Sequence, residues 1–227
     1  MEKMDAVKAS VGKAAAQLVG DGMLVGLGTG STAAHFINHL IKRCREGLEI
    51  TAVATSDRSF HQAKAGGIQM RNIEEITSID ITFDGADEID PNKNMIKGGG
   101  GALLREKIVA SMSHEMVVMV DESKLVEALG AFPLPVEIVS FAHRSTINKI
   151  QILGYDGALR KDQDGDTYIT DNGNYIFDIH NNGPIVNPRE MHHTLIDIPG
   201  VVETGLFFNL AGRVIVGYSH GNVEIRS

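Results

Sequence analysis

The sequence is poor in cysteine, in basic residues and in long apolar runs. Cys44 is the single cysteine among 227 residues, so the chain cannot form an internal disulfide, and no neighbouring ligands place this thiol in a metal cluster. No stretch approaches the roughly 18 apolar residues that a membrane-spanning helix needs, and the first residues lack the apolar core of a signal peptide. These absences predict a cytoplasmic protein with no membrane association.

Basic residues are fewer than acidic residues in this chain. Lys and Arg total 21 against 29 Asp and Glu, which gives a formal net charge of -8 and a pI near 5.6. Nucleic acid is therefore not expected as a partner, because phosphate backbones are bound mainly by excess Lys and Arg. A small anionic substrate remains compatible, since a few lysines and backbone amides can hold a phosphate inside an acidic protein. The apolar share of 43% is that of an ordinary globular chain, long enough for one large domain or for a main domain with a smaller companion.

A glycine-rich turn follows the first predicted strand. Residues 23–25 predict a buried strand, and residues 33–41 predict an amphipathic helix. The turn between them points free N–H groups and the positive end of a helix at one place, as phosphate sites do. Its spacing, G-x-G-x-G followed by Ser-Thr, is neither the dinucleotide fingerprint G-x-G-x-x-G nor a Walker A loop, which needs a lysine. The interpretation that remains is a compact phosphate-binding turn, formed by Thr29, Gly30, Ser31 and Thr32. The alternative is a tight turn in which Ser31 or Thr32 only caps the helix.

The segment from Phe83 to Lys107 concentrates the groups suited to acid–base chemistry. Apolar residues alternate up to Phe83 and predict a strand, which places Asp84 and Asp87 at its carboxyl end, where open α/β sheets bind ligands. Lys97 precedes four glycines, which allow backbone amides to approach a ligand closely. The helix that follows is predicted to bury one apolar face and to leave Glu106 and Lys107 pointing elsewhere; that face comprises Ala102, Leu103, Ile108, Val109 and Met112. The alternative interpretation is a solvated acidic loop and a flexible turn.

Strands and helices alternate over the first part of the chain, and this pattern predicts a mostly parallel, doubly wound sheet. From Phe132 to Pro135 prolines break the pattern, and Asp-Gly and Asn-Gly dipeptides at 164–165 and 172–173 predict antiparallel hairpins. We therefore predict an α/β main domain over residues 1–130 and 208–227 and a small α+β domain over residues 131–207. His35 and His39 lack the acidic residue of H-E-x-x-H, and residues 162–166 lack the glycine and glutamate positions of a calcium loop, so no metal site is predicted.

Taken together, these motifs resemble those of the A-type ribose-5-phosphate isomerases. The resemblance covers nearly the whole chain in the same order, and it is most specific in DGADE and KGGG. The matching segments are Gly28–Thr32, Asp84–Glu88, Lys97–Gly100, Arg105–Lys107, Phe132–Glu137 and Thr170–Asn174. Gly101 and Leu104 depart from the pattern, where relatives have Ala and Thr.

The resemblance implies an aldose–ketose isomerase that interconverts D-ribose 5-phosphate and D-ribulose 5-phosphate through an enediolate, in the non-oxidative pentose phosphate pathway. It implies Glu106 as general base, with Asp84, Asp87 and Lys97 at the reacting end of the sugar. It further implies a Rossmann-like domain interrupted by a ferredoxin-like domain, a homodimer or homotetramer, and neither cofactor nor metal. The substrate-binding residues that it implies are Thr29, Gly30, Ser31, Thr32, Asp84, Gly85, Ala86, Asp87, Lys97, Gly98, Gly99, Gly100, Lys124 and Lys8.

Two other functions compete with this expectation. A coenzyme A transferase also carries a glutamate beside a glycine-rich loop, but there the carboxylate attacks an acyl group and forms a thioester. A phosphosugar-sensing regulator would need a DNA-binding module, and the sequence contains neither a helix-turn-helix pattern nor a basic segment.

Overall fold

The computed structural model describes residues 2–227, and the chain folds as two compact units. Unit 1 comprises residues 1–86, 105–125 and 209–227, and unit 2 comprises residues 87–104 and 126–208. The domains expected from the sequence divide the chain differently, because residues 87–104 and 126–130 group with the second unit. Met1, which the sequence analysis counts in the main domain, lies outside the described residues.

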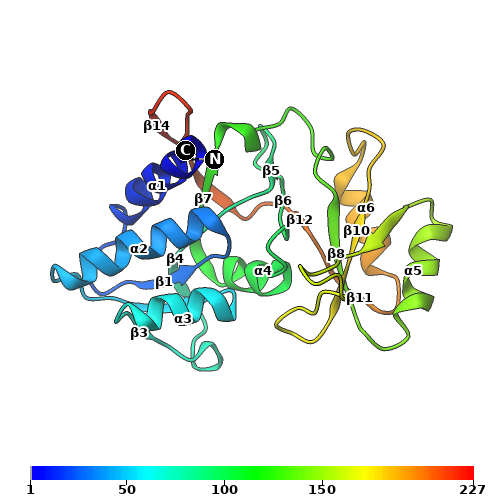
Figure 1. The fold of residues 1–227 in the computed structure, drawn as a ribbon, viewed down its shortest axis with the longest axis horizontal. Coiled ribbons are helices and arrows are strands. Elements are labelled where there is room, and N and C mark those ends of the chain that lie inside the picture. The colour runs from blue at the N-terminus through cyan, green and yellow to red at the C-terminus, as the bar shows by residue number, and fades with distance from the viewer. Residues whose placement is uncertain (1) are drawn as a thin grey trace. The chain divides into compact units, whose positions relative to one another are not determined.

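Unit 1 is built on a seven-stranded sheet with the order β14-β13-β7-β4-β1-β2-β3 (Figure 1). Neighbouring strands are parallel except for the last hairpin, in which β14 runs antiparallel to β13. Because parallel strands end at the same edge, the loops after β1, β2, β4 and β7 meet there. The strands are β1 (Leu24–Leu27), β2 (Thr51–Ala54), β3 (Gln69–Met70), β4 (Ile79–Asp84), β7 (Ser113–Asp121), β13 (Ala211–Gly217) and β14 (Val223–Arg226).

Two apolar clusters hold helices against this sheet. The larger cluster joins α1 and α2 to the sheet, with Phe36 of α2 stacked on Phe83 of β4 at a centroid distance of 4.5 Å. The smaller cluster places Val109 of α4 against Val53 and Ile79. The helical elements are α1 (Glu2–Ala16), α2 (Ser31–Arg45), α3 (Asp57–Ala65), α4 (Leu103–Ser111) and the short 3-10 turns η1 (Ile73–Glu75) and η2 (Glu122–Lys124).

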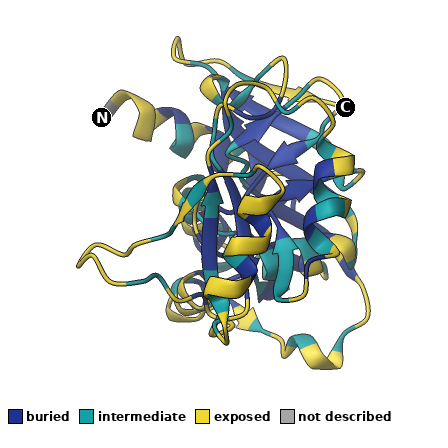
Figure 2. Ribbon diagram, turned by 90° about the vertical axis from the view of Figure 1, so that its right-hand side faces the viewer, coloured by how far each residue is buried: buried dark blue, intermediate teal, exposed yellow. Residues whose placement is uncertain are grey.

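Unit 2 contains an antiparallel four-stranded sheet, β11-β8-β10-β9, and a small three-stranded sheet, β12-β6-β5. Its core includes Ile150 from α5 and Leu195 from α6, packed on Val136 and Phe177 of the sheet. Figure 2 shows many of the strands in the buried colour and many loops in the exposed one. The elements are β5 (Glu88–Ile89), β6 (Met95–Ile96), β8 (Leu134–Ile138), β9 (Gly157–Leu159), β10 (Tyr175–Ile179), β11 (Val201–Thr204), β12 (Leu206–Phe207), α5 (His143–Ile152) and α6 (Pro188–Ile196).

The α/β class predicted from the sequence is confirmed, and so is the antiparallel character of residues 131–207. Between the two predicted turns, residues 167–170 form no strand, and Thr167 makes only an isolated bridge with Lys161. The Asn172-Gly173 turn does form, with Gly173 N–H donating to the carbonyl of Thr170 at 2.9 Å. Within residues 2–227, none of the helices combines the length and the apolar character needed to cross a bilayer.

Candidate active site

The turn after β1 leads directly into α2. Gly30 is the residue that caps α2, with φ 110° and extended ψ, a conformation that glycine adopts without strain. In the described part of the chain no side chain caps this helix, so the alternative in which Ser31 or Thr32 serves as the cap is wrong. Lys8 of α1 instead donates from Nζ to Ser31 Oγ at 3.0 Å. The first N–H groups of α2 and a lysine ammonium therefore face the same place, which suits a dianionic phosphate.

Asp84, the last residue of β4, joins that strand to the turn after β1. Its side chain is fully buried, and Oδ1 accepts hydrogen bonds from Thr29 N at 3.0 Å and from Gly85 N at 2.8 Å. Gly28 leaves room for this contact, because a Cβ at that position would stand 2.2 Å from Asp84 Oδ1. The carboxylate is therefore held in one orientation at the carboxyl edge of the sheet by charge-assisted hydrogen bonds.

Glu106 lies on α4 and is only 3% exposed. It shares the buried face with Leu103 and Val109, at the i, i+3, i+6 spacing of one helix side, whereas Ile108 is 46% exposed. The prediction that Ile108 belongs to the apolar face and that Glu106 points elsewhere is therefore wrong. The carboxyl group of Glu106 is therefore largely withdrawn from bulk solvent.

The remaining candidates of unit 1 lie at the same edge of the sheet. Gly85 and Ala86 follow β4, and Lys124 ends the η2 turn after β7, the neighbour of β4. Thr29 donates from Oγ1 to Ser56 Oγ at 2.8 Å and shares a 2.7 Å hydrogen bond with Thr55 Oγ1. Its hydroxyl is thus engaged with the turn after β2, while its N–H is bound by Asp84.

The other candidates belong to unit 2 and form a second group. Lys97 is 2% exposed, its N–H donates to Gly205 O at 2.9 Å, and its ammonium lies 5.5 Å from the centre of the Phe207 ring. Asp87 Oδ2 accepts from Gly99 N at 2.7 Å, so this aspartate holds the glycine loop. Gly98 has φ 109°, and both Gly99 and Gly100 are exposed. Asp87 and the glycine loop are therefore hydrogen-bonded to each other, and Lys97 directly precedes that loop in the chain.

Comparison with known proteins gives consistent results. The sequence model described as ribose 5-phosphate isomerase A (phosphoriboisomerase A) matches residues 51–221. A protein of Protochlamydia amoebophila named ribose-5-phosphate isomerase A is 56% identical over 211 residues, covering 93% of this chain and 91% of that one. The chain belongs to the ribose 5-phosphate isomerase A family.

Solved structures of the family have the same fold. The ribose 5-phosphate isomerase A of Methanocaldococcus jannaschii has a TM-score of 0.90 and 41% identity, over 97% of this chain and 98% of that one. The Plasmodium falciparum enzyme has a TM-score of 0.94 and 35% identity, over 98% of each chain. A further D-ribose-5-phosphate isomerase, solved in complex with phospho-erythronic acid, has a TM-score of 0.90 and 38% identity, over 97% of each chain.

Sequence reasoning assigned no role to two residues that organise the family motifs. Arg160 donates from Nη1 to the carbonyl of Gly98 at 2.7 Å, inside the KGGG loop. Glu137 is fully buried and accepts hydrogen bonds from three side chains of the TDNGN segment. Neither role leaves a local signal, because the contacts join residues far apart in the chain.

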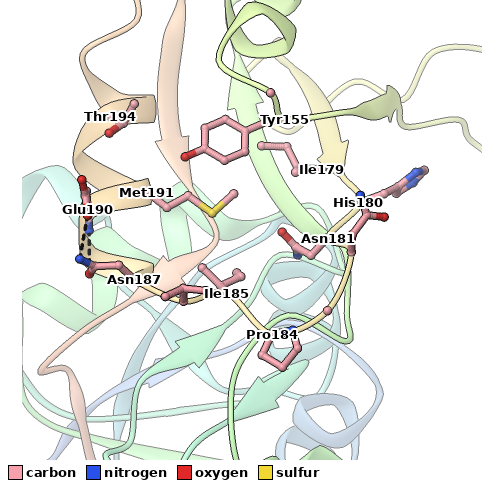
Figure 3. Close-up of a pocket in the computed structure, with 14 residues that line it drawn as sticks. Tyr155, Ile179, His180, Asn181, Pro184, Ile185, Asn187, Glu190, Met191 and Thr194 are labelled. Carbon is pink, nitrogen blue, oxygen red and sulfur yellow. Dashed lines mark hydrogen bonds between the residues drawn. The ribbon is translucent and has the colours of Figure 1, made fainter.

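Unit 2 also contains a cavity of about 350 Å³ beside α6, and none of its lining residues belongs to the predicted site. Asn187 caps α6 there by accepting from Glu190 N, and it donates from Nδ2 to Glu190 Oε2 at 2.8 Å (Figure 3). These polar groups satisfy a helix end reciprocally, so they have a structural role. Residues 2–227 contain no cluster of three or more His, Cys, Asp or Glu side chains arranged to hold a metal ion.

Proposed function

We propose that this chain interconverts D-ribose 5-phosphate and D-ribulose 5-phosphate by moving a proton between C2 and C1 through an enediolate. Membership of the ribose 5-phosphate isomerase A family is the observation that carries the proposal. The family structure with phospho-erythronic acid supports it, because that ligand is a phosphorylated polyhydroxy acid, chemically close to an open-chain sugar phosphate.

Glu106 is the proposed general base. One carboxylate that removes the proton from one carbon can return it to the neighbouring carbon on the same face of the enediolate. Its burial supports this role, since a carboxyl group in water is a weak base and desolvation strengthens it. A positioned base typically contributes about 10² to 10⁴ in rate.

That factor alone does not account for an enzymatic rate, so the developing oxyanion also needs fixed donors. Lys97 and the amides of the glycine loop are the proposed donors. Asp84 and Asp87 are proposed to assist ring opening and to move the hydroxyl proton. Their fixed orientations support the assignment, since each carboxylate is already held by a backbone N–H.

The phosphate end of the sugar is assigned to the turn after β1. We propose that residues 29–32 bind it together with Lys8, and that Lys124, at the same sheet edge, contacts the substrate as well. Binding energy at the phosphate, which does not react, helps to position the carbon acid. We further propose a cytoplasmic homodimer or homotetramer that needs no cofactor or metal.

A coupled assay of ribose 5-phosphate conversion tests the function, and the Glu106→Gln variant tests the base. We expect turnover by the native chain, a loss of about 10² to 10⁴ in kcat for Glu106→Gln, and unchanged inhibition by phospho-erythronic acid. Glu127→Gln, an exposed glutamate of unit 2, is the matched control and is expected to leave kcat unchanged. Near-native turnover by Glu106→Gln would show that the base is misassigned.

The coenzyme A transferase alternative predicts different chemistry. It requires a thioester on a glutamate, which hydroxylamine would trap after incubation with an acyl-CoA. We expect no trapped glutamyl derivative. Its appearance, without turnover of ribose 5-phosphate, would replace the isomerase proposal.

A further inference from the structure

The guanidinium of Arg160 is held in a fixed plane by Asp178. Arg160 Nε donates to Asp178 Oδ2 at 2.9 Å, and Nη2 donates to Oδ1 at 2.5 Å. The two residues are diagonal neighbours on one face of the β9–β10 pair, because Asp178 lies opposite Ala158. Their side chains are 14% and 20% exposed. A two-point pair at this level of burial fixes direction as well as charge.

The third guanidinium nitrogen of Arg160, Nη1, reaches the glycine loop. Nη1 donates to the carbonyl of Gly98 at 2.7 Å and to the carbonyl of Gly99 at 3.2 Å. Arg160 therefore links the sheet of unit 2 to two successive peptide groups of the loop. Lysine could not replace it, because a single ammonium cannot satisfy a carboxylate at two points and two carbonyls in one plane.

These contacts set the direction of the loop amides. In a planar trans peptide the C=O of one residue and the N–H of the next point opposite ways. Fixing the Gly98 carbonyl therefore fixes the N–H of Gly99, which donates to Asp87 Oδ2 at 2.7 Å. Fixing the Gly99 carbonyl directs the N–H of Gly100 away from the guanidinium.

The loop has no side chains of its own that could anchor it. Residues 98–101 are all glycine, so their backbone loses the most entropy on ordering. Besides Arg160, the loop is held by Asp87 Oδ2 and by the N–H of Gly101, which donates to the carbonyl of Gly98 at 2.9 Å. A cavity of about 350 Å³ borders the loop, lined by Gly99, Gly100, Lys161, Asp162, Gln163, Tyr168 and Arg160 itself. The phenol of Tyr168 packs closely against Gly101, the last residue of the loop, since a Cβ at that position would stand 2.2 Å from the phenol oxygen. Burial raises the pKa of this phenol, which keeps it protonated.

We propose that Arg160, held by Asp178, is a positioning residue that orients the glycine-loop amides for the reaction. The kinetic part of this inference rests on the proposed function, in which those amides stabilise the oxyanion. Arg160 acts through the Gly98 and Gly99 carbonyls, and its effect is expected in kcat more than in KM.

The test combines hydrogen exchange with kinetics on Arg160→Met, Arg160→Lys and Asp178→Asn in the full chain. Lys161→Met is the control, because Lys161 is the exposed neighbour of Arg160 and its ammonium donates to Thr167 Oγ1 at 3.5 Å rather than to the loop carbonyls. We expect amide exchange in the peptide covering residues 97–101 to rise at least about tenfold in both Arg160 variants and to stay native in the control. We expect kcat to fall about 10²-fold in Arg160→Met and KM to change less than about threefold.

Exchange and turnover answer separate questions. If the native chain does not convert ribose 5-phosphate, the proposed function fails, while the exchange data still decide whether Arg160 orders the loop. Native exchange in Arg160→Met, or a native kcat in Arg160→Lys, overturns the positioning role. If Arg160→Met does not fold, as judged by circular dichroism, Asp178→Asn decides in its place, with faster exchange at 97–101 supporting the role and native exchange overturning it.

Discussion

The ammonium of Lys8 lies 3.0 Å from the hydroxyl of Ser31, the first residue of α2, although the two residues are 23 positions apart in the chain. The start of a helix carries partial positive charge, so a cation placed there is disfavoured unless an anion lies close to both. The contact therefore supports a phosphate position at this turn more strongly than the glycines alone do.

Lys8→Met should weaken substrate binding without slowing chemistry. Loss of one charge-assisted contact to a phosphate is worth about 1.4 kcal/mol, so KM should rise roughly tenfold while kcat stays near native. Lys13→Met is the control, because Lys13 is exposed in the last turn of the same helix. Steady-state kinetics checks both variants. An unchanged KM for Lys8→Met would remove Lys8 from the binding site.

Gly28→Ala should disable the site through Asp84. The added Cβ would stand 2.2 Å from Oδ1 and 2.6 Å from Cα of Asp84, so the carboxylate and the backbone that bears it must move. We expect kcat to fall about 10²-fold and stability to fall by about 1 to 3 kcal/mol. Gly20→Ala is the control, because the nearest atom to its Cβ would be Met23 Cε at 3.5 Å, an ordinary contact. Native turnover by Gly28→Ala would separate Asp84 from the chemistry.

The loops at the carboxyl edge of the parallel sheet could be predicted from the sequence, because the strands that lead into them have clear local patterns. Buried runs that end in polar residues mark β1, β4 and β7, and parallel pairing brings their ends together. Asp84 and the turn after β1 could therefore be placed at one edge before the fold was known. Glu106 on α4, by contrast, was placed on the wrong face of its helix. Amphipathic reasoning assigns a glutamate to the solvent side, whereas here Glu106 is buried and Ile108 is exposed.

The grouping of residues 87–104 with unit 2 could not be predicted. The segment that carries Lys97 includes β5 and β6, two residues each, which are too short for periodicity to identify. β6 pairs with β12, which comes much later in the chain, so its place in the fold depends on a non-local contact. The role of Arg160 could not be predicted for the same reason, since its partners are backbone carbonyls of a loop that is distant in the sequence.

Removing divalent metal ions should not affect turnover. The proposed oxyanion donors are Lys97 and backbone amides, so the mechanism has no step that requires a metal ion. We expect the same kcat after incubation with EDTA and after re-addition of magnesium or manganese, measured in the coupled assay. Complete loss in EDTA, with recovery on adding metal, would indicate a metal-dependent mechanism instead.

Stability should decrease at mildly acidic pH, in part because of His39. Burial, followed by the positive charges of Lys42, Lys13 and His35, lowers the pKa of this histidine below its ordinary value of 6.5. Below about pH 6.5 the unfolded chain therefore binds a proton more readily than the folded chain, and the free energy of unfolding falls as pH falls.

His39→Gln should lose less stability than the native chain between pH 8 and pH 5.5, as measured by urea unfolding. His61→Gln, an exposed histidine on α3, is the control and should follow the native curve. A His39→Gln curve that falls as steeply as the native one would contradict this account.

Glu137 should be essential for the order of the TDNGN segment. Its Oε1 accepts from Thr170 Oγ1 and Asn172 Nδ2 at 3.0 Å and from Asn174 Nδ2 at 2.9 Å, while Oε2 has no hydrogen-bond partner among the described residues. Glu137→Gln keeps the accepting oxygen but loses the charge, so we expect a cost of about 1 to 2 kcal/mol. Glu137→Leu fills similar space but leaves three donors without an acceptor, so we expect about 3 kcal/mol or more.

Urea unfolding followed by circular dichroism measures these costs, with Glu127→Gln as the exposed control of the same unit. Because the chain has two units, tyrosine fluorescence should be followed as well, to detect separate unfolding of unit 2. The test is whether Glu137→Leu loses more stability than Glu137→Gln. If Glu137→Leu is as stable as Glu137→Gln, the three converging hydrogen bonds do not hold the segment, since their loss would then cost no more than loss of the charge.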